Sequence, residues 1–485
     1  MKKYLIALLM LLIPLLTSPV WATDYFIDQS GNGDGDGSSY ANRMSMANYG
    51  AGNLDASLDP GDTIYLCGTI TTEFDTRESG TSGNPIILDG ACSGEGGTDA
   101  TINGTANGIH LTTDDYWTIQ NITITNFTGR GIYNQNSDSI IVDSCTISGG
   151  DGSNPDHGIQ MQRTGGSLLT GIEIKNCSIG TISNANNDTF NRNGIVAQGV
   201  SGLKIYNNTV STTYVTGIRL LKSTAGDNDD NSNCEVYEND ITNYWGGGII
   251  SHNSDGTIIK YNKIHDANAG LGIGVAYDSD NNEIYGNLIF NTGTNSTNLW
   301  NGVDINHDSQ TGKVYNNTIY KVSGNCIVID DGTANCDGWI IKNNIFDASD
   351  NDGSQVDEYA FRCNGDSISF VSDYNFLVPH ADQGSDVFYD GDDDTSGYTL
   401  AEVQNGDPET GVQETHSYGT DPGLNDEASG DFTLESGANA IDAGTSLDYE
   451  KLLPGSSWPD GVLTVPCILD CDIGAYDYGT KIVIP

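Results

Sequence analysis

The sequence predicts an all-β solenoid, in which short strands stack coil upon coil around one shared core. An internal repeat is the main observation: a strand that begins Gly-Ile, such as GIQMQ at 158 or GIRLL at 217, is followed by a second apolar strand such as IYNNTV or VYNNTI. No segment of helical period lies between the two strands, which excludes ordinary β-α-β crossovers. One unit of this size cannot bury its apolar face, whereas stacked units share a continuous core.

A recurrent polar position marks the second strand of each repeat. Its intervals are 24, 32, 31, 31, 23, 25, 30 and 27 residues, and its members are Asn121, Cys145, Cys177, Asn208, Asn239, Asn262, Asn287, Asn317 and Asn344. An Asn at the same inner bend of every coil can hydrogen-bond to the Asn above and below and satisfy buried turn amides. We therefore predict an asparagine ladder. Cys145 and Cys177 would replace two rungs as buried thiols, with a disulfide between them as the less favoured alternative.

The N-terminus has the features of a secretory signal peptide. Lys2 and Lys3 precede an apolar run over residues 4–16, and small residues around Ala22 offer a cleavage site. This run is too short to favour a membrane span, and no later segment reaches 18 apolar residues. We expect cleavage after Ala22 and a secreted protein, extracellular or periplasmic, without membrane insertion.

Charge and cysteine content narrow the class further. The chain has 19 basic and 66 acidic residues and a net charge of −47, which repels nucleic acid at long range but leaves room for a local cationic groove. Ten cysteines in an exported chain make disulfides plausible, and Cys326/Cys336 and Cys467/Cys471 are close enough in sequence to close local loops. Acidic stretches at 31–37, 347–352 and 390–394 resemble incomplete calcium loops, so calcium binding stays open and no metal ligand is assigned.

These features together resemble the right-handed parallel β-helix proteins found among secreted bacterial carbohydrate-active proteins. The opening segments YFIDQSGNGDGDGSS (25–39) and LDPGDTIYLCG (58–68) and the closing segments at 418–444 and 472–478 are similar to the ends of such proteins. The resemblance implies an extended sugar chain bound along the stacked strands, and we expect a monomer with a polysaccharide substrate. The expected organisation is a signal peptide (1–22), an N-terminal cap with the first coils (23–107), regular coils (108–377), an acidic loop or insert (378–417) and a C-terminal closing region (418–485).

The alternation of each Gly-Ile strand predicts which side chains face outward. The Ile faces the core, so the third and fifth positions face solvent, and equivalent positions in successive coils lie about 4.8 Å apart. Long loops beside these strands would wall a groove. The residues predicted to bind substrate there are Gln160, Gln162, Arg163, Gln198, Arg219 and Asn306.

Two chemistries remain open for this face. A lyase abstracts the α-proton of a uronate whose carboxylate is neutralised by a cation. His252 or Lys222 would be the base, Arg219 or Arg163 the carboxylate partner, and Tyr277 or His307 the acid.

A hydrolase instead needs two carboxylates. Asp304 and Asp330 lie on adjacent coils, one outward position apart, which gives a separation of roughly 8 Å and suits inversion. No catalytic signature transfers: the Gly-His-Gly of polygalacturonases is absent, and residues 154–157, Asn-Pro-Asp-His, differ in order from the Asp-Pro-His of mannuronan epimerases.

We rank the lyase slightly ahead of the inverting glycoside hydrolase. A non-catalytic glycan-binding or cell-surface β-helix is the third alternative, favoured by the outward Val196, Ile250 and Val328. The remaining histidines are expected at the surface or in turns; they are His110, His265, His380 and His416.

Overall fold

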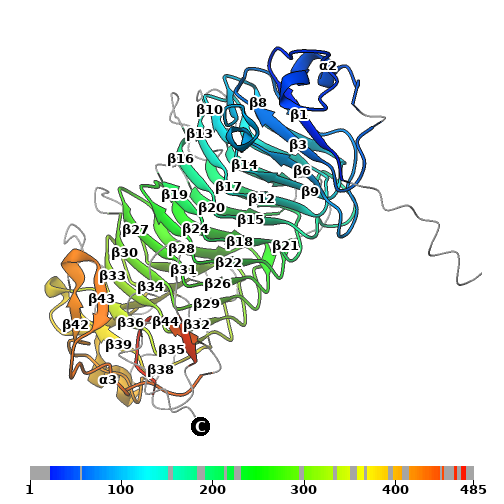
Figure 1. Ribbon diagram of the computed structural model, residues 1–485. Helices are drawn as coiled ribbons and strands as arrows, with labels where there is room; N and C mark the ends of the chain where they lie inside the picture. The colour runs from blue at the N-terminus through cyan, green and yellow to red at the C-terminus, as the bar shows by residue number, and fades with distance from the viewer. Residues whose placement is uncertain are drawn as a thin grey trace, which may run out of the picture.

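The body of the protein is one solenoid of parallel strands, shown in Figure 1. The computed structural model describes residues 22–54, 57–150, 157–182, 192–211, 216–222, 231–293, 300–330, 336–349, 358–364, 369–391, 397–406, 414–447, 450–452, 464–466 and 471–476. The signal peptide expected at 1–22 therefore falls almost wholly outside the described residues. Among those that are described, no helix is long and apolar enough to cross a membrane.

Three long sheets form the walls of the solenoid, and each coil adds one strand to each of them. Sheet A has 14 strands: β2 (Met44–Ser45), β1 (Asp24–Asp28), β3 (Thr63–Cys67), β6 (Ile86–Asp89), β9 (Trp117–Gln120), β12 (Ile140–Asp143), β15 (Glu173–Lys175), β18 (Lys204–Tyr206), β22 (Glu235–Tyr237), β26 (Ile258–Lys260), β29 (Glu283–Tyr285), β32 (Lys313–Tyr315), β35 (Ile340–Lys342) and β38 (Val371–Asp373). Sheet B has 12: β39 (Phe376–Val378), β36 (Ile345–Asp347), β33 (Thr318–Val322), β30 (Leu288–Thr292), β27 (Lys263–Ala267), β23 (Asp240–Thr242), β19 (Thr209–Ser211), β16 (Ser178–Ile182), β13 (Thr146–Gly149), β10 (Thr123–Thr125), β7 (Thr101–Asn103) and β4 (Thr69–Ile70). Sheet C has 13: β41 (Tyr398–Thr399), β40 (Asp386–Asp390), β37 (Phe361–Asn364), β34 (Ile327–Asp330), β31 (Val303–Asn306), β28 (Leu271–Ala276), β24 (Gly247–His252), β20 (Thr216–Leu221), β17 (Asn193–Gln198), β14 (His157–Gln162), β11 (Arg130–Gln135), β8 (Asn107–Thr112) and β5 (Phe74–Asp75).

Stacks of aliphatic side chains fill the interior because the same strand position faces inward in every coil. In sheet C, for example, Ile132, Ile159, Ile195 and Ile218 pair in register and are fully buried. The all-β solenoid predicted from the repeat is confirmed.

Short elements cover the two ends of this core. The helix α2 (Met46–Gly50) packs Met46 and Tyr49 into the core, and the Tyr49 ring stacks on Phe74 at 4.8 Å. At the other end α3 (Leu400–Asn405) buries Val403. Residues 378–417, expected to be a loop or insert, thus contain the sheet C strand β40 and this helix. The 3₁₀ turns are η2 (Tyr40–Asn42), η3 (Cys92–Glu95), η4 (Ala381–Gln383) and η5 (Glu427–Ser429).

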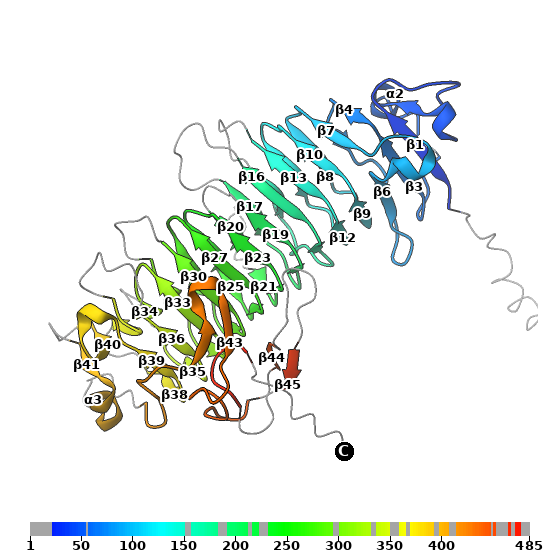
Figure 2. The same ribbon diagram turned by 60° about the vertical axis from the view of Figure 1, so that its left-hand side comes forward.

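The described part of the C-terminal region lies against the outer face of sheet B. The hairpin of β42 (Leu424–Asp426) and β43 (Asp431–Leu434) runs beside β33 and β36 in both ribbon views (Figures 1 and 2). Its Phe432 ring lies 4.7 Å from Phe290 and 5.8 Å from Tyr320, both on sheet B. The remaining short strands are β21 (Asn231–Ser232), β25 (Ser254–Asp255), β44 (Glu450–Leu452) and β45 (Thr464–Pro466). Sheet B is thereby covered over these coils.

The asparagine ladder is present at the bend that follows sheet A. Asn287 Nδ2 donates to Asn317 Oδ1 at 2.9 Å, and its own Oδ1 accepts from Asn262 Nδ2 at 3.0 Å. The same contacts run through the rungs Asn208, Asn239, Asn262, Asn287, Asn317, Asn344 and Asn375. The ladder predicted from the sequence ends at Asn344, one rung before Asn375.

One predicted rung was wrong. Asn121 is exposed and has a φ of 57°, which makes it the turn residue before the rung. The next residue, Ile122, is 1% exposed and occupies the rung position in that coil. Asn is common in both places because it tolerates positive φ and also bonds to buried amides, so the two positions cannot be told apart by residue type alone.

Cysteine chemistry agrees only in part with expectation. Cys145 and Cys177 are free buried thiols, as predicted. Cys326 is also a free thiol, so the local loop closure proposed for Cys326 and Cys336 was wrong. A disulfide instead joins Cys67 to Cys92. Cys471 is disulfide-bonded, and Cys467 lies outside the described residues.

A buried glutamate closes the ladder at its C-terminal end. Glu414 is fully buried, accepts from Asn375 Nδ2 at 3.2 Å, and also bonds to the Ser417 hydroxyl. Burial raises the pKa of Glu414 to about 7, although the donors Ser372, Ser417 and Asn375 act in the opposite direction.

Glu414→Gln is expected to remove a pH-dependent loss of stability. Because the folded pKa lies above the ordinary value of 4.5, the wild type is stabilised below about pH 4.5 and loses that stabilisation as the pH rises towards about 7. Urea denaturation from pH 4 to 8 should show the variant gaining on the wild type across this interval. The exposed Glu435→Gln serves as control; parallel profiles for wild type and Glu414→Gln would contradict the expectation.

Candidate functional site

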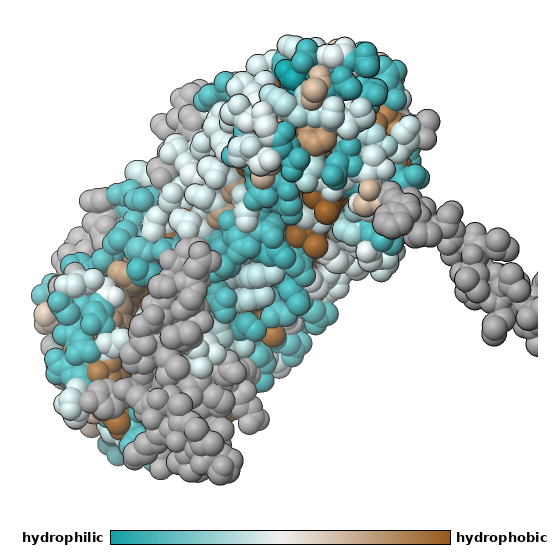
Figure 3. All heavy atoms as spheres, viewed as in Figure 1, coloured by the Kyte–Doolittle hydropathy of each residue, from teal (hydrophilic) through white to brown (hydrophobic). Residues whose placement is uncertain are grey.

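The outer face of sheet C brings the predicted site residues into columns along the solenoid. One column runs through Tyr133, Gln160, Val196, Arg219, Ile250, Gly274, Asp304 and Val328, each paired with the next in parallel register. A second column contains Gln135, Gln162 and Gln198, and further along Asn306 pairs with Asp330. The surface of the molecule is mainly hydrophilic in the view of Figure 3, with apolar atoms in small scattered groups.

A third column, missed by sequence reasoning, precedes the Gly-Ile pair. Arg130, His157 and Asn193 pair in register there. They face outward because the following Gly faces the core: a Cβ on Gly131 would lie 2.6 Å from Ile147 Cγ2. The sequence does align these polar residues, one position before each Gly-Ile pair. Strict alternation counted from the Ile predicts that this position faces the core, so the column was not recognised.

Arginines concentrate on four neighbouring strands of this sheet. The chain has seven arginines, and four of them belong to or directly flank β11, β14, β17 and β20: Arg130, Arg163, Arg192 and Arg219. This concentration stands out in a chain whose net charge is −47. Arg192 is 3% exposed and Arg219 is partly buried, so these guanidinium groups contribute a positive field to this part of sheet C. A field of this sign attracts anions.

Glutamine side chains tie part of this surface together. Arg130 Nε donates to Gln160 Oε1 at 2.5 Å, and Gln160 Nε2 donates to Gln198 Oε1 at 3.1 Å. The Tyr133 hydroxyl donates to Gln162 Oε1 at 2.9 Å, and the Arg130 guanidinium lies 4.4 Å from the Tyr133 ring centre. Gln160 is 4% and Gln198 8% exposed. These two residues, predicted to contact substrate, are placed to hold Arg130 in position, Gln160 directly and Gln198 through Gln160.

His157 lies buried within the arginine-rich part. Its Nδ1 is 3.2 Å from Asn193 Nδ2. Burial, together with the charges of Arg130 and Arg219, lowers the pKa of His157 to about 3. The imidazole is therefore neutral at physiological pH and accepts a hydrogen bond from the amide.

A second group of residues follows along the same face. Tyr277 lies between two histidines, with its ring centre 4.9 Å from that of His252 and 4.6 Å from that of His307. His307 Nδ1 is 2.5 Å from Asn306 Oδ1, and Asn306 Nδ2 donates to Asp304 Oδ1 at 2.6 Å. The structure thus brings together the predicted residues His252, Tyr277, Asp304, Asn306 and His307, with Asp330 paired to Asn306.

Electrostatics link this group to the arginines. Burial lowers the pKa of His252 to about 3, and the charges of Arg219 and His307 act in the same direction. Burial also lowers the pKa of Arg219, while nearby Tyr277 partly offsets this. His252 is therefore an uncharged proton acceptor within the field of an arginine.

The pKa of Asp304 is shifted in the opposite direction, to a higher value. Burial raises the pKa of Asp304 and neighbouring Asp330 raises it further, whereas amide donors from Asn301 and Asn306 lower it. A carboxyl group in such surroundings retains its proton to higher pH, as a general acid requires.

The other residues predicted for the site have fewer contacts with these two groups of side chains. Lys222 is half-buried and directly follows β20, and the Arg163 guanidinium lies near Gly166. Val196, Ile250 and Val328 face outward as predicted but are at most 7% exposed. The Ile250 side chain lies over Gly274, where an added Cβ would approach its Cδ1 to 2.9 Å. His380, expected at the surface or in a turn, is 3% exposed and lies 3.4 Å from Glu358.

Several solved structures resemble this chain at low identity, and no curated protein matches it. Pectate lyase Pel9A is 15% identical, with 96% of this chain and 98% of that chain covered and a TM-score of 0.45. XylC in complex with xylose is 11% identical, with coverages of 77% and 86% and a TM-score of 0.48. A mannuronic acid specific polysaccharide family 6 lyase from the human gut microbiota is 15% identical, with coverages of 73% and 75% and a TM-score of 0.46.

A family model gives the firmer assignment. The model described as "Right handed beta helix region" matches residues 107–228 and 193–368. These segments together span more than half of the 485-residue chain, and the coils they cover carry most of the ladder and most of the outer face of sheet C. The protein therefore belongs to the right-handed β-helix family.

Proposed function

We propose that this is an exported polysaccharide lyase, which cleaves a uronate-containing chain by β-elimination on the outer face of sheet C. The observation that carries the proposal is the concentration of arginines on β11, β14, β17 and β20 in an otherwise strongly acidic chain. The repeated carboxylates of a polyuronate are attracted to such an arginine-rich face, whereas a neutral or cationic polymer is not.

The site residues have matching roles in this reaction. Arg219 binds the uronate carboxylate and acidifies the adjacent C5 proton. His252, which is neutral at working pH, accepts that proton. Tyr277 donates its hydroxyl proton to the leaving glycosidic oxygen as the C4–O bond breaks and the C4–C5 double bond forms. An incoming carboxylate beside His252 also raises the pKa of this histidine, which makes it a better base when substrate is bound.

A second candidate is an inverting glycoside hydrolase. The raised pKa of Asp304 favours it, since Asp304 would be the general acid and Asp330 the base that activates water. The two reactions give different products, because elimination leaves an unsaturated uronate and hydrolysis does not.

A substrate panel separates the alternatives. Purified protein would be incubated with alginate, pectate, glycosaminoglycans and neutral glycans, with ultraviolet absorbance of unsaturated uronates and reducing ends measured in parallel. We expect absorbing product from an anionic polymer, and its loss in His252→Ala but not in the control His265→Gln on sheet B. Reducing ends without absorbance would show that the protein is a hydrolase and would contradict the lyase proposal. Binding without either product would leave only a glycan-binding protein.

A further inference from the structure

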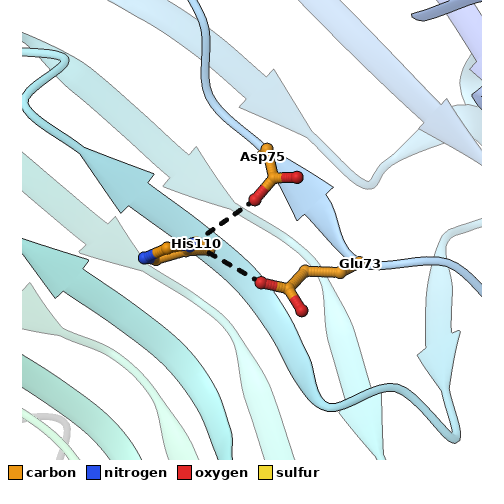
Figure 4. A group of neighbouring side chains, drawn as sticks. All are labelled: Glu73, Asp75 and His110. Carbon is orange, nitrogen blue, oxygen red and sulfur yellow. Dashed lines mark ion pairs between the residues drawn. The ribbon is translucent and has the colours of Figure 1, made fainter. Parts of the chain in front are cut away.

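Two carboxylates and one histidine converge where sheet C begins. Asp75 on β5 pairs in register with His110 on β8, and Glu73 directly precedes β5. His110 Nδ1 lies 3.5 Å from Glu73 Oε1 and 3.4 Å from Asp75 Oδ1. Figure 4 shows both carboxylates directed at this histidine. Among the residues that the structure describes, this is the one group of three potential ligands whose donor atoms all lie within 4.8 Å of one another.

Neighbouring groups hold two members of this trio in place. Glu73 accepts from the Asn107 side-chain amide at 3.0 Å and from its backbone N–H at 3.3 Å. The ring of His110 stacks on Tyr133 at 5.1 Å, with an interplanar angle of 2°. Its other nitrogen, Nε2, is 3.0 Å from Thr112 Oγ1. Hydrogen bonds of this kind orient the ligands of metal sites and select the histidine tautomer.

The arrangement differs from an ordinary histidine–carboxylate pair, and the chain contains such a pair for comparison. His265 also stacks on an aromatic ring and contacts two carboxylates, but Asp240 lies at its Nε2 (2.9 Å) and Asp266 at its Nδ1 (2.8 Å). Each nitrogen there has its own acceptor. At His110 both carboxylates face a single nitrogen, at the longer distances of 3.4 and 3.5 Å.

The Thr112 hydroxyl can accept from Nε2–H, and in that tautomer the lone pair of Nδ1 faces the two carboxylate oxygens. Three electron-rich atoms in this arrangement favour a cation between them. A proton on Nδ1 can bond well to only one of the two oxygens, whereas a metal ion is bound by all three atoms at once.

We propose that Glu73, Asp75 and His110 form a binding site for a divalent transition-metal ion of the zinc class. Ligand atoms at about 2.1 Å from a tetrahedral ion are separated by about 3.4 Å, which is the spacing of Nδ1 from both carboxylate oxygens. Calcium at about 2.4 Å would accept a similar spacing, but it prefers six to eight oxygen ligands. The nitrogen donor therefore selects zinc or a similar metal over calcium.

The ion would join two successive coils near the start of the solenoid. Glu73 and Asp75 belong to the first coil of sheet C and His110 to the second. Asp75 has a side-chain exposure of 56%, so the site is open to ions from solvent and leaves a coordination position for water. Because the three ligands converge only in the folded chain, metal binding is expected to raise its melting temperature.

Calorimetric titration of untagged, chelator-treated protein with Zn²⁺, Mn²⁺ and Ca²⁺ tests this proposal. We expect one strong Zn²⁺ site and a zinc-dependent rise in Tm, with calcium binding at least about 10-fold weaker. His110→Gln and Asp75→Asn should each weaken zinc binding at least about 100-fold. The matched control His265→Gln removes a histidine with the same number of carboxylate neighbours and should leave zinc binding unchanged.

Two outcomes would overturn the site. Equal zinc affinity in wild type and both variants would show that the binding lies elsewhere. Absence of a saturable site, or a calcium affinity above that for zinc, would show that the trio is only a proton-mediated ion pair or an oxygen-selective site. Asp75→Asn preserves the shape and hydrogen bonding of the side chain, so this variant still tests the site if His110→Gln fails to fold. None of these measurements depends on the proposed lyase activity.

Discussion

Arg219→Ala is expected to lower kcat/KM on the cleaved polyuronate by about 100- to 1,000-fold. Removing one partner of a desolvated charge pair costs about 2–5 kcal/mol, which corresponds to about 30- to 5,000-fold, and the expected loss lies in the middle of this range. Arg219 lies in the outward column of sheet C, and burial lowers its pKa, so its charge is partly removed from water before substrate arrives. The measurement is initial rate against substrate concentration, followed by absorbance of the unsaturated product.

Two further variants make the Arg219 experiment specific. Arg362→Ala removes an arginine from the same outward column, further along the solenoid at β37, and should leave the rate within about 3-fold. Arg219→Lys retains a positive charge without the planar pair of donors and should recover only part of the activity. An Arg219→Ala protein as active as Arg362→Ala would remove the carboxylate-binding role from our proposal.

Asn287→Ala is expected to reduce the free energy of unfolding by about 3–5 kcal/mol. Its Oδ1 accepts from both the backbone N–H and the side-chain amide of Asn262, and its Nδ2 donates to Asn317 and to the Ile259 carbonyl. Asn287 is fully buried, so the groups left behind cannot turn to water. Each buried polar group without a partner costs about 1–3 kcal/mol.

Urea denaturation followed by circular dichroism measures this loss of stability. The exposed Asn425→Ala is a suitable control, because its amide bonds to Thr433 Oγ1 at the surface and the change should cost less than about 0.5 kcal/mol. Equal denaturation midpoints for the two variants would mean that the ladder does not stabilise the native coils.

The sequence alone was enough to predict the solenoid and most of the ladder. A residue such as Asn287 or Ile218 has the same surroundings in every coil, so each repeat is an independent copy of the same structural signal. Periodicity also predicted correctly that Gln160, Arg219 and Asp304 face outward in one register. The error at Asn121 arose where a turn and a rung adjoin and both accept the same residue type.

The sequence did not predict which residues of different coils lie close to one another. Arg130 and His157 were missed because the backbone at the Gly-Ile pair departs from strict alternation, which only the packing of Gly131 against Ile147 reveals. The disulfide between Cys67 and Cys92 is a further case, since spacing does not specify pairing.

The sequence by itself thus determined the architecture, the asparagine ladder and the outward face of sheet C, because these follow from a short-range pattern repeated along the chain. Tertiary structure alone decided which of those outward groups meet: Tyr277 between His252 and His307, Arg130 against Gln160, and both carboxylates of Glu73 and Asp75 at one nitrogen of His110. The physical reason is that coils differ in length. The number of residues between two strands, and hence which side chains become neighbours, depends on the loops, whereas the pattern within each strand does not.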